Sequence, residues 1–228
     1  MNPAAAPARR TRFHVTVADE RHESYAAEIC AEMASSAQVR GTGIAKRSPA
    51  YIVTKMREGK AVIAFSAQNE WAGFCYIESW GHGAFVANSG LIVAPRFRHS
   101  GLARAIKRRV FHLSRARFPK AKLFGLTTSL AVMKINSELG YVPVTYSELT
   151  DDSEFWAGCT SCVNHPILES KGHRNCLCTA MLFDPSTASR RSAGLLRDVA
   201  RATHLYARYR AWRDAGSRHT RRGGGEGR

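Results

Sequence analysis

The chain has 228 residues, 44% of them hydrophobic, which is enough to bury one good core and leave a short appendage. No apolar run approaches the roughly 20 residues that span a bilayer, so we expect no membrane span. Residues 1–12 contain three Arg, no acidic residue and no hydrophobic signal core. We therefore expect a disordered lead-in to a cytoplasmic protein.

The net charge of +16 is concentrated at the two ends of the chain. Residues 186–228 hold 11 Lys and Arg against 3 Asp and Glu, and residues 1–12 add three Arg. Arginine-rich ends are typical of solvated extensions, or of loose contact with nucleic acid or acidic surfaces. The charge alone therefore does not make the body a nucleic-acid-binding domain.

The first part of the chain alternates between strand and helix patterns. A polar loop with two glycines, residues 40–49, holds the adjacent cations Lys46 and Arg47, for which a plain basic surface loop is the alternative. Glu78 and His82 are the candidate general bases, each with a surface or satisfied polar role as the alternative. The expected elements are strands at 14–17, 60–65 and 71–80, and helices at 20–34 and 50–58.

The centre of the chain, residues 86–107, reads as a strand, a glycine turn and a helix. The apolar run before Pro95 predicts a strand, and the spacing of apolar residues after Gly101 predicts an amphipathic helix with Lys and Arg on its solvated face. A helix N-terminus is a natural anion site, Gly101 permits close approach, and Arg98 adds a charge. The turn therefore suggests a diphosphate site, with an ordinary strand-to-helix turn as the alternative.

This turn resembles a family signature. Arg98, Gly101 and Ala103 resemble the Arg/Gln-x-x-Gly-x-Gly/Ala motif of the GNAT N-acetyltransferases, over about residues 13–150. The resemblance implies an α/β (α+β) fold whose mixed central sheet has a V-shaped splay and flanking helices. It also implies acetyl-CoA as cosubstrate, contacted by Leu91, Ile92, Val93, Arg98, His99, Ser100, Gly101, Leu102 and Ala103.

The next segment gives a closer resemblance. We expect a strand at 122–129, a helix at 130–139 capped by Gly140, and a strand at 141–149. Leu-Thr-Thr at 126–128 and Glu-Leu-Gly-Tyr-Val-Pro-Val at 138–144 are similar to the acetyltransferase domain of N-acetylglutamate synthases. By resemblance Tyr141 would lie near the departing CoA thiolate, with a core aromatic as the alternative.

The resemblance implies L-glutamate as acceptor and a place in arginine biosynthesis. Two carboxylates need at least two cations. The implied acceptor residues are Lys46, Arg47, Asn88, Leu126, Thr127 and Lys134, of which Lys134 stands in for a cation that this sequence lacks after Thr-Thr. Another amine, or another acyl group such as succinyl, stays open.

The implied reaction is direct attack of the deprotonated amine on the thioester. We expect Glu78 or His82 as base and Tyr141 near the leaving group, and backbone N–H groups near Ile92 and Val93 to stabilise the oxyanion. No cysteine occupies an obvious nucleophile position. A ternary-complex mechanism is therefore expected.

Four cysteines lie within twenty residues: Cys159, Cys162, Cys176 and Cys178. Two close thiol pairs can hold one tetrahedral zinc, and a cytoplasmic chain favours metal over disulfides. A structural zinc is therefore predicted, with four reduced thiols as the alternative.

The sequence divides into a lead-in (1–12), a GNAT domain (13–150), a Cys-rich element that completes the sheet (151–185), and a basic helix with a disordered tail (186–228). We expect the helix at 193–215. A homodimer is a further expectation. The alternative function from another class is a nucleic-acid-binding module that uses the Cys-rich element and the basic tail.

Overall fold

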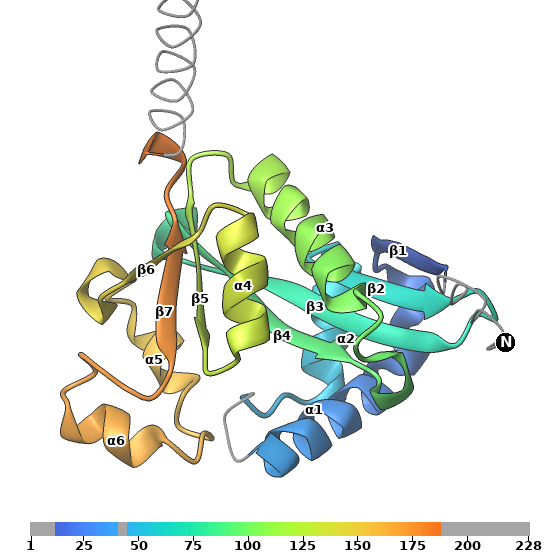
Figure 1. Cartoon of the computed structure of the whole chain (residues 1–228), viewed down its shortest axis with the longest axis horizontal. Coiled ribbons are helices and arrows are strands. Elements are labelled where there is room, and N and C mark those ends of the chain that lie inside the picture. The colour runs from blue at the N-terminus through green and yellow to red at the C-terminus, as the bar shows by residue number, and fades with distance from the viewer. Residues whose placement is uncertain (1–11, 41–44, 188–228) are drawn as a thin grey trace, which may run out of the picture. The chain divides into compact units, whose positions relative to one another are not determined.

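The computed structural model describes residues 12–40 and 45–187 (Figure 1). The described residues form one seven-stranded mixed sheet in the order β1-β2-β3-β4-β5-β7-β6. All neighbouring strands are antiparallel except β4 and β5. The strands are β1 (Phe13–Val17), β2 (Ala61–Ser66), β3 (Trp71–Trp80), β4 (Phe85–Val93), β5 (Lys122–Thr127), β6 (Val142–Val144) and β7 (Thr179–Phe183).

Six α-helices flank the sheet in the described part of the chain. They are α1 (Ala26–Arg40), α2 (Pro49–Arg57), α3 (Leu102–Arg117), α4 (Leu130–Glu138), α5 (Ser153–Ala157) and α6 (His165–Ser170). A 3-10 turn, η1 (Glu20–Tyr25), leads into α1, and a second, η2 (Gly81–Gly83), joins β3 to β4.

The core forms two layers because alternate strand residues point to opposite faces of the sheet. In β2, Ala61 and Ile63 pack under α1 and α2, whereas Val62 and Ala64 pack under α3. A third cluster around Phe124 joins β5 and β7 to α5 and α6. Since Phe124 alternates with Leu123, which packs on the α3 side, α5 and α6 lie on the same face as α1 and α2 (Figure 1).

The parallel strands at the centre separate after a short contact. Residues 85–87 of β4 pair with residues 122–124 of β5, and the pairing ends there. Beyond that point β4 continues along β3, and β5 continues along β7. The sheet therefore has a V-shaped splay beginning at Asn88, as the predicted fold class requires, and that prediction is confirmed.

Most predicted elements are present, and two of them need correction. The strand expected at 141–149 is only β6, because Tyr146 begins a 3-10 turn closed by a Thr145–Glu148 capping box. The helix expected at 20–34 begins as η1, capped by Asp19, and then runs on to residue 40. Two short helices, α5 and α6, were not predicted.

The Cys-rich segment is part of the sheet domain rather than an appendage. Its last strand, β7, lies between β5 and β6. The described residues up to 185, those of the Cys-rich segment included, belong to one compact unit. The helix expected at 193–215 and nearly all of the lead-in lie outside the described residues.

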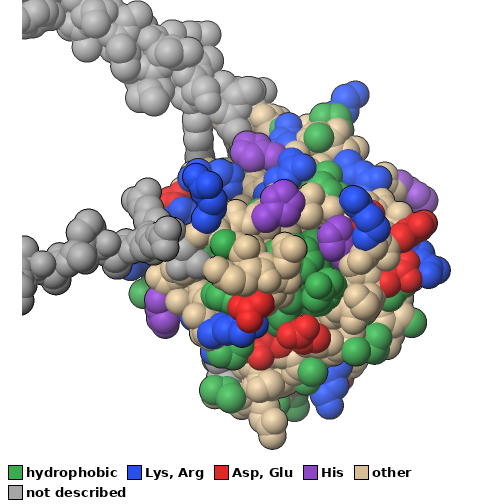
Figure 2. All heavy atoms as spheres, turned by 90° about the vertical axis from the view of Figure 1, so that its right-hand side faces the viewer, with side chains coloured by type: hydrophobic (Ala, Val, Ile, Leu, Met, Phe, Trp, Pro, Cys, Tyr) green, Lys and Arg blue, Asp and Glu red, His purple; other side chains and the backbone are tan. Residues whose placement is uncertain are grey.

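No helix within residues 12–40 and 45–187 is both long enough and apolar enough to cross a bilayer. On the face drawn in Figure 2, basic and acidic side chains are interspersed around an apolar area. That face shows no single continuous basic surface.

Candidate active site

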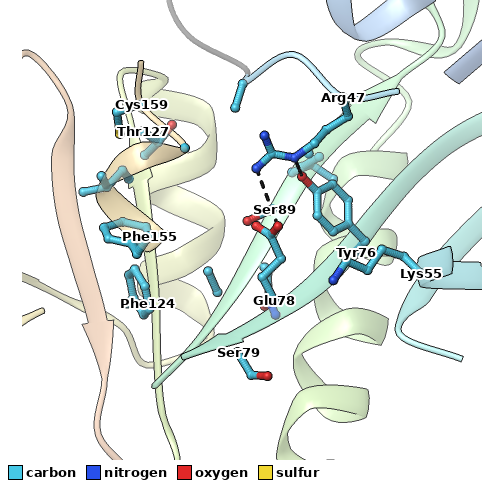
Figure 3. A pocket seen from close by; sticks show the side chains of 18 of the residues that line it. Arg47, Lys55, Tyr76, Glu78, Ser79, Ser89, Phe124, Thr127, Phe155 and Cys159 are labelled. Carbon is cyan, nitrogen blue, oxygen red and sulfur yellow. Dashed lines mark hydrogen bonds and ion pairs between the residues drawn. The ribbon is translucent and has the colours of Figure 1, made fainter. Parts of the chain in front are cut away.

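A cleft of about 800 Å³ opens at the splay, on the sheet face that carries α2 and α5. Figure 3 shows its two walls. The polar wall comes from the loop before α2, from α2 and from β3, and includes Arg47, Tyr51, Lys55, Tyr76 and Glu78. The apolar wall comes from β5, α5 and the loop after α5, and includes Phe124, Leu126, Thr127, Phe155 and Cys159.

The cap of α2 positions Arg47 in the polar wall. Ser48 is the N-cap, its hydroxyl accepting from the N–H of Tyr51, and Pro49 begins the helix. The guanidinium of Arg47 donates from Nε to the hydroxyl of Tyr76 at 3.0 Å and lies 3.5 Å from a carboxylate oxygen of Glu78 (Figure 3). Arg47 is therefore already partly neutralised within the protein.

Glu78 has the geometry of a general base. Its side chain is 11% exposed, and Oε1 accepts a hydrogen bond from the hydroxyl of Tyr51. Burial, and then the hydrogen bond to Glu78, raises the pKa of Tyr51, so this hydroxyl stays protonated. Among the described residues no hydrogen bond reaches Oε2, which leaves that oxygen able to accept a proton from a ligand.

The other cations of the polar wall differ in their pairing. Lys46 is exposed, and its backbone N–H donates to the hydroxyl of Ser161 at 3.2 Å, which joins this loop to the Cys-rich segment. Lys60 pairs with Glu58 at 2.9 Å. Burial lowers the pKa of Lys55, although the charge of Glu78 opposes that effect.

The apolar wall is built around an aromatic cluster. The ring of Phe124 lies 4.9 Å from that of Phe155 and 5.7 Å from that of Trp80. Asp152 caps α5 and also accepts from the N–H of Gly81 at 3.3 Å, which holds α5 against the end of β3. Leu126 and Thr127, both predicted acceptor residues, lie in this wall.

A second polar cluster lies at the inner end of the cleft and involves a residue that sequence reasoning missed. Lys107 lines the cleft but is only 2% exposed, although the sequence placed the Lys and Arg of this helix on the solvated face. The available signal was a second buried row on α3, because Lys107 lies three, four and seven residues before Val110, Phe111 and Ser114, all buried.

Asn88 connects this inner cluster. Its Oδ1 accepts from Tyr141 at 3.2 Å and from Lys107 at 3.4 Å, and its Nδ2 donates to Ser114 at 2.8 Å. Tyr141 is 2% exposed, packs against Phe111 and does not line the cleft. The structure thus places Tyr141 behind Asn88, and its predicted place near the CoA thiolate stays a prediction.

The turn before α3 is open above its glycine. Gly101 has φ +85°, and a Cβ built on it would meet no heavy atom within 4 Å. His99 and Ser100 form the turn, and Leu102 and Ala103 begin the helix. An anion can therefore approach the N-terminus of α3 without displacing a side chain.

The side chain of Arg98 does not extend into that open space. Its guanidinium pairs with Glu32 of α1 at 2.8 Å, donates to Ser36 at 2.9 Å and donates from Nε to the carbonyl of Val93 at 3.2 Å. In this structure Arg98 ties the turn to α1, and its predicted contact with a diphosphate stays a prediction.

A β-bulge near Gly90 shapes the strand beside the splay. The β3–β4 register shifts there, and Gly90 has φ +62° with the ring of Tyr76 and the end of Met33 where a Cβ would lie. Beyond the bulge, the N–H of Ala94 donates to Ala72 of β3. Since N–H groups alternate along a strand, Val93 directs its N–H toward the splay, whereas Ile92 directs its N–H toward β3.

Two other predicted residues lie away from the cleft. His82 is exposed in η2 with φ +53°, and Lys134 is exposed on α4. Neither lines the cleft, so of the two candidate bases only Glu78 is positioned in it. Lys46, Arg47, Asn88 and Leu91 do line it.

The four cysteines gather near Tyr146, whose pKa is raised by burial and then by the neighbouring thiols. Cys159 and Cys178 line the cleft, which the sequence did not predict. Burial raises the pKa of Cys159 to about 11 and that of Cys178 to about 12, so neither is a ready nucleophile at neutral pH. Within residues 12–40 and 45–187, no three His, Cys, Asp or Glu side chains are arranged to hold a metal ion.

Comparison with known proteins gives the fold. No protein-family model and no curated protein matches the sequence. Solved structures do match. N-acetylglutamate synthase from Neisseria gonorrhoeae, complexed with coenzyme A and N-acetyl-glutamate, is 15% identical, with a TM-score of 0.54 over 77% of this chain and 36% of that one.

Two shorter proteins match over most of their own length. A putative acetyltransferase from Salmonella typhimurium with acetyl-CoA is 14% identical, with a TM-score of 0.52, over 77% of this chain and 95% of that one. A GNAT-family acetyltransferase from Staphylococcus aureus is 9% identical, with a TM-score of 0.53, over 76% and 99%. The chain spans about a third of the length of the synthase, and the GNAT resemblance is confirmed at the level of the fold.

Proposed function

We propose that this protein is an acyl-CoA-dependent N-acyltransferase that acts on an acidic amine, with L-glutamate as the first candidate. The observation that carries the proposal is the cleft at the splay, where a buried carboxylate, Glu78, is held beside several cations. The fold shared with acetyltransferases supports the reaction class.

The charges of the cleft support an acidic acceptor. Lys46, Lys55 and Lys107 line it without an ion pair among the described residues, whereas Arg47 and Lys60 have carboxylate partners. An acceptor with two carboxylates would neutralise part of this excess. Formation of N-acetylglutamate for arginine biosynthesis is the specific form of the proposal, and transfer to another acidic amine is its alternative.

The turn at Gly101 fits the diphosphate of a CoA thioester. The open space above the glycine and the N–H groups at the start of α3 suit an anion. Bound there, acetyl-CoA would supply the activated acyl group. Leu91 of β4, which lies between this turn and the splay in the chain, lines the cleft.

Glu78 would take a proton from the ammonium of the acceptor through Oε2, because only the neutral amine has a lone pair for attack. The N–H of Val93 would then stabilise the negative charge that develops on the carbonyl oxygen. The C–N bond forms as the C–S bond breaks, the sulfur leaves with the electron pair, and the second proton that the nitrogen loses on becoming an amide balances the proton that the thiolate gains. This direct transfer requires a ternary complex, and ping-pong kinetics would contradict it.

The test is release of CoA thiol from acetyl-CoA and succinyl-CoA with a panel of amino acids. Release that requires glutamate supports the specific proposal. Release with another acidic amine replaces the acceptor, and release with neutral amines alone overturns the acidic assignment.

A matched pair of variants tests the CoA turn. Gly101→Asp and Gly101→Asn impose a similar backbone conformation, which Asp and Asn tolerate better than other residues, but only Asp adds a negative charge. Gly101→Asp should weaken CoA binding by at least about tenfold relative to Gly101→Asn. Equal affinities would place the diphosphate elsewhere.

No structural zinc enters this proposal, because the four thiols do not form a metal-holding group in the described residues. The homodimer and the contact of the basic tail with nucleic acid stay predictions. Salt-dependent RNA or DNA binding that is lost on removing residues 186–228 tests the latter.

A further inference from the structure

Lys107 reaches the cleft from the far side of the sheet. It belongs to α3, which packs on the face opposite α2 and α5. The strands β4 and β5 cease to pair after residues 87 and 124, and Lys107 lines the cleft through that gap. Its ammonium therefore lies at the inner end of the cleft, on the side nearest α3.

The surroundings of this ammonium are neutral. Its Nζ lies 3.4 Å from Oδ1 of Asn88 and 5.5 Å from the centre of the Tyr141 ring. The thiol of Cys75 on β3 is also near, and burial raises the pKa of Cys75 to about 11, so it carries no charge at neutral pH. Within the described residues no carboxylate lies within 4.0 Å of Lys107.

The hydrogen bonds around Asn88 fix this arrangement before any ligand binds. Nδ2 of Asn88 donates to Ser114, whose hydroxyl donates in turn to the carbonyl of Val110 at 2.8 Å. Oδ1 must therefore face Lys107 and Tyr141. Of the three N–H donors of the ammonium, Asn88 takes one through a long bond, and the other two have no hydrogen-bond acceptor in the described part of the chain.

A buried ammonium without a negative partner is costly, since removal from water is not offset by attraction to an opposite charge. Burial accordingly lowers the pKa of Lys107. A ligand that brings one negative charge to the inner end of the cleft would supply the missing partner and raise the fraction of Lys107 that is protonated.

We propose that Lys107 forms an anion subsite at the inner end of the cleft, which receives one negative charge of a bound ligand. That charge is a carboxylate of the acceptor or the thiolate of CoA. The identity of the ligand rests on the proposed function, whereas the existence of the subsite does not.

Isothermal titration calorimetry of the full chain, in two buffers of different ionisation enthalpy, tests the subsite. The probes are L-glutamate, L-glutamine, CoA and desulfo-CoA. Lys107→Met removes the charge at similar length, and Arg109→Met removes a charge from an exposed position on the same helix. Lys107→Met should bind the affected probe roughly 10- to 100-fold more weakly than wild-type protein, and any proton uptake that accompanies binding to wild-type protein should be lost with it.

The probes separate the two sources of the charge. A loss of affinity for glutamate, with CoA unaffected, assigns the acceptor carboxylate, and a loss for CoA but not desulfo-CoA assigns the thiolate. Affinities within about twofold of wild type for all probes, with unchanged proton uptake, overturn the subsite. Arg109→Met should behave as wild type.

A second measurement does not depend on the proposed function. Sodium acetate, at ionic strength matched with sodium chloride, should raise the melting temperature of wild-type protein and of Arg109→Met more than that of Lys107→Met. If glutamate and CoA fail to bind, the proposed function fails while this difference still supports the subsite. An equal response of all three proteins to acetate overturns the subsite.

Discussion

The cleft has two polar corners that treat a positive charge in opposite ways. The first, the paired corner, is formed by Arg47, Tyr51, Tyr76 and Glu78. The guanidinium of Arg47 has a carboxylate oxygen of Glu78 3.5 Å away and the hydroxyl of Tyr76 at 3.0 Å. The second, the neutral corner, is formed by Lys107, Asn88, Tyr141 and Ser114. The ammonium of Lys107 is more deeply buried, yet its close partners among the described residues are all neutral. A cation that already has a carboxylate partner has less charge to offer a ligand than one whose partners are neutral, whatever motif contains it.

The largest expected effect comes from the paired corner. Glu78→Gln keeps the shape of the side chain but cannot accept the acceptor's proton, so the rate of acyl transfer should fall roughly 10²- to 10⁴-fold. A thiol-release assay over a range of pH measures this, with the exposed Glu169→Gln as control. A variant that retains the wild-type rate and pH profile would remove Glu78 from the role of base.

Asn88→Leu should remove the hydrogen bonds that connect the neutral corner. It removes the acceptor of Lys107 and Tyr141 and the partner of Ser114 at once, so the free energy of unfolding should fall by about 3 kcal/mol in urea denaturation. Adding Lys107→Met should restore part of that loss, because the uncompensated ammonium is then gone. If the effects of the two substitutions on the free energy of unfolding are strictly additive, the ammonium of Lys107 is compensated by some other group.

The neutral corner should also make stability depend on pH. Because burial lowers the pKa of Lys107 below its usual 10.5, the unfolded chain binds more protons between the two values, and wild-type stability should gain as pH rises through that window. Each unit of lowering corresponds to about 1.4 kcal/mol. Relative to Lys107→Met, wild-type protein should therefore be least stable below the pKa that Lys107 has in the folded protein. The gap, which is the difference between the two free energies of unfolding, should narrow toward pH 10. A gap that widens with pH contradicts this.

The smallest effect is expected at the exposed cation beside the paired corner. Lys46 is solvated, and its hydrogen bonds among the described residues, to Ser161 and from Arg47, involve its backbone, so Lys46→Ala should change the free energy of unfolding by less than about 0.5 kcal/mol. Its effect on the acceptor KM should stay below that of Lys107→Met. A larger effect would mean that Lys46 closes over the acceptor in the bound state.

The sequence by itself determined the sheet and the glycine turn. The strand expected at 71–80 matches β3 to the residue, Pro95 marked the end of β4, and Gly101 marked the start of α3. These features depend on local rules, since period-two alternation, the missing N–H of proline and the freedom of glycine act within a few residues. The glycine turn and the strand before it also carried the resemblance to GNAT proteins.

Only the tertiary structure decided how the charges pair. The sequence placed Lys107 with the solvated residues of α3, because a lysine beside Ile106 looks the same whether or not a gap in the sheet receives it. It gave no sign that Arg98 would pair with Glu32, or that Tyr141 would donate to Asn88. These partners lie 66 and 53 residues away along the chain, and electrostatic energy depends on distance and burial in space. The register of β4 against β3 and the gap between β4 and β5 set those distances.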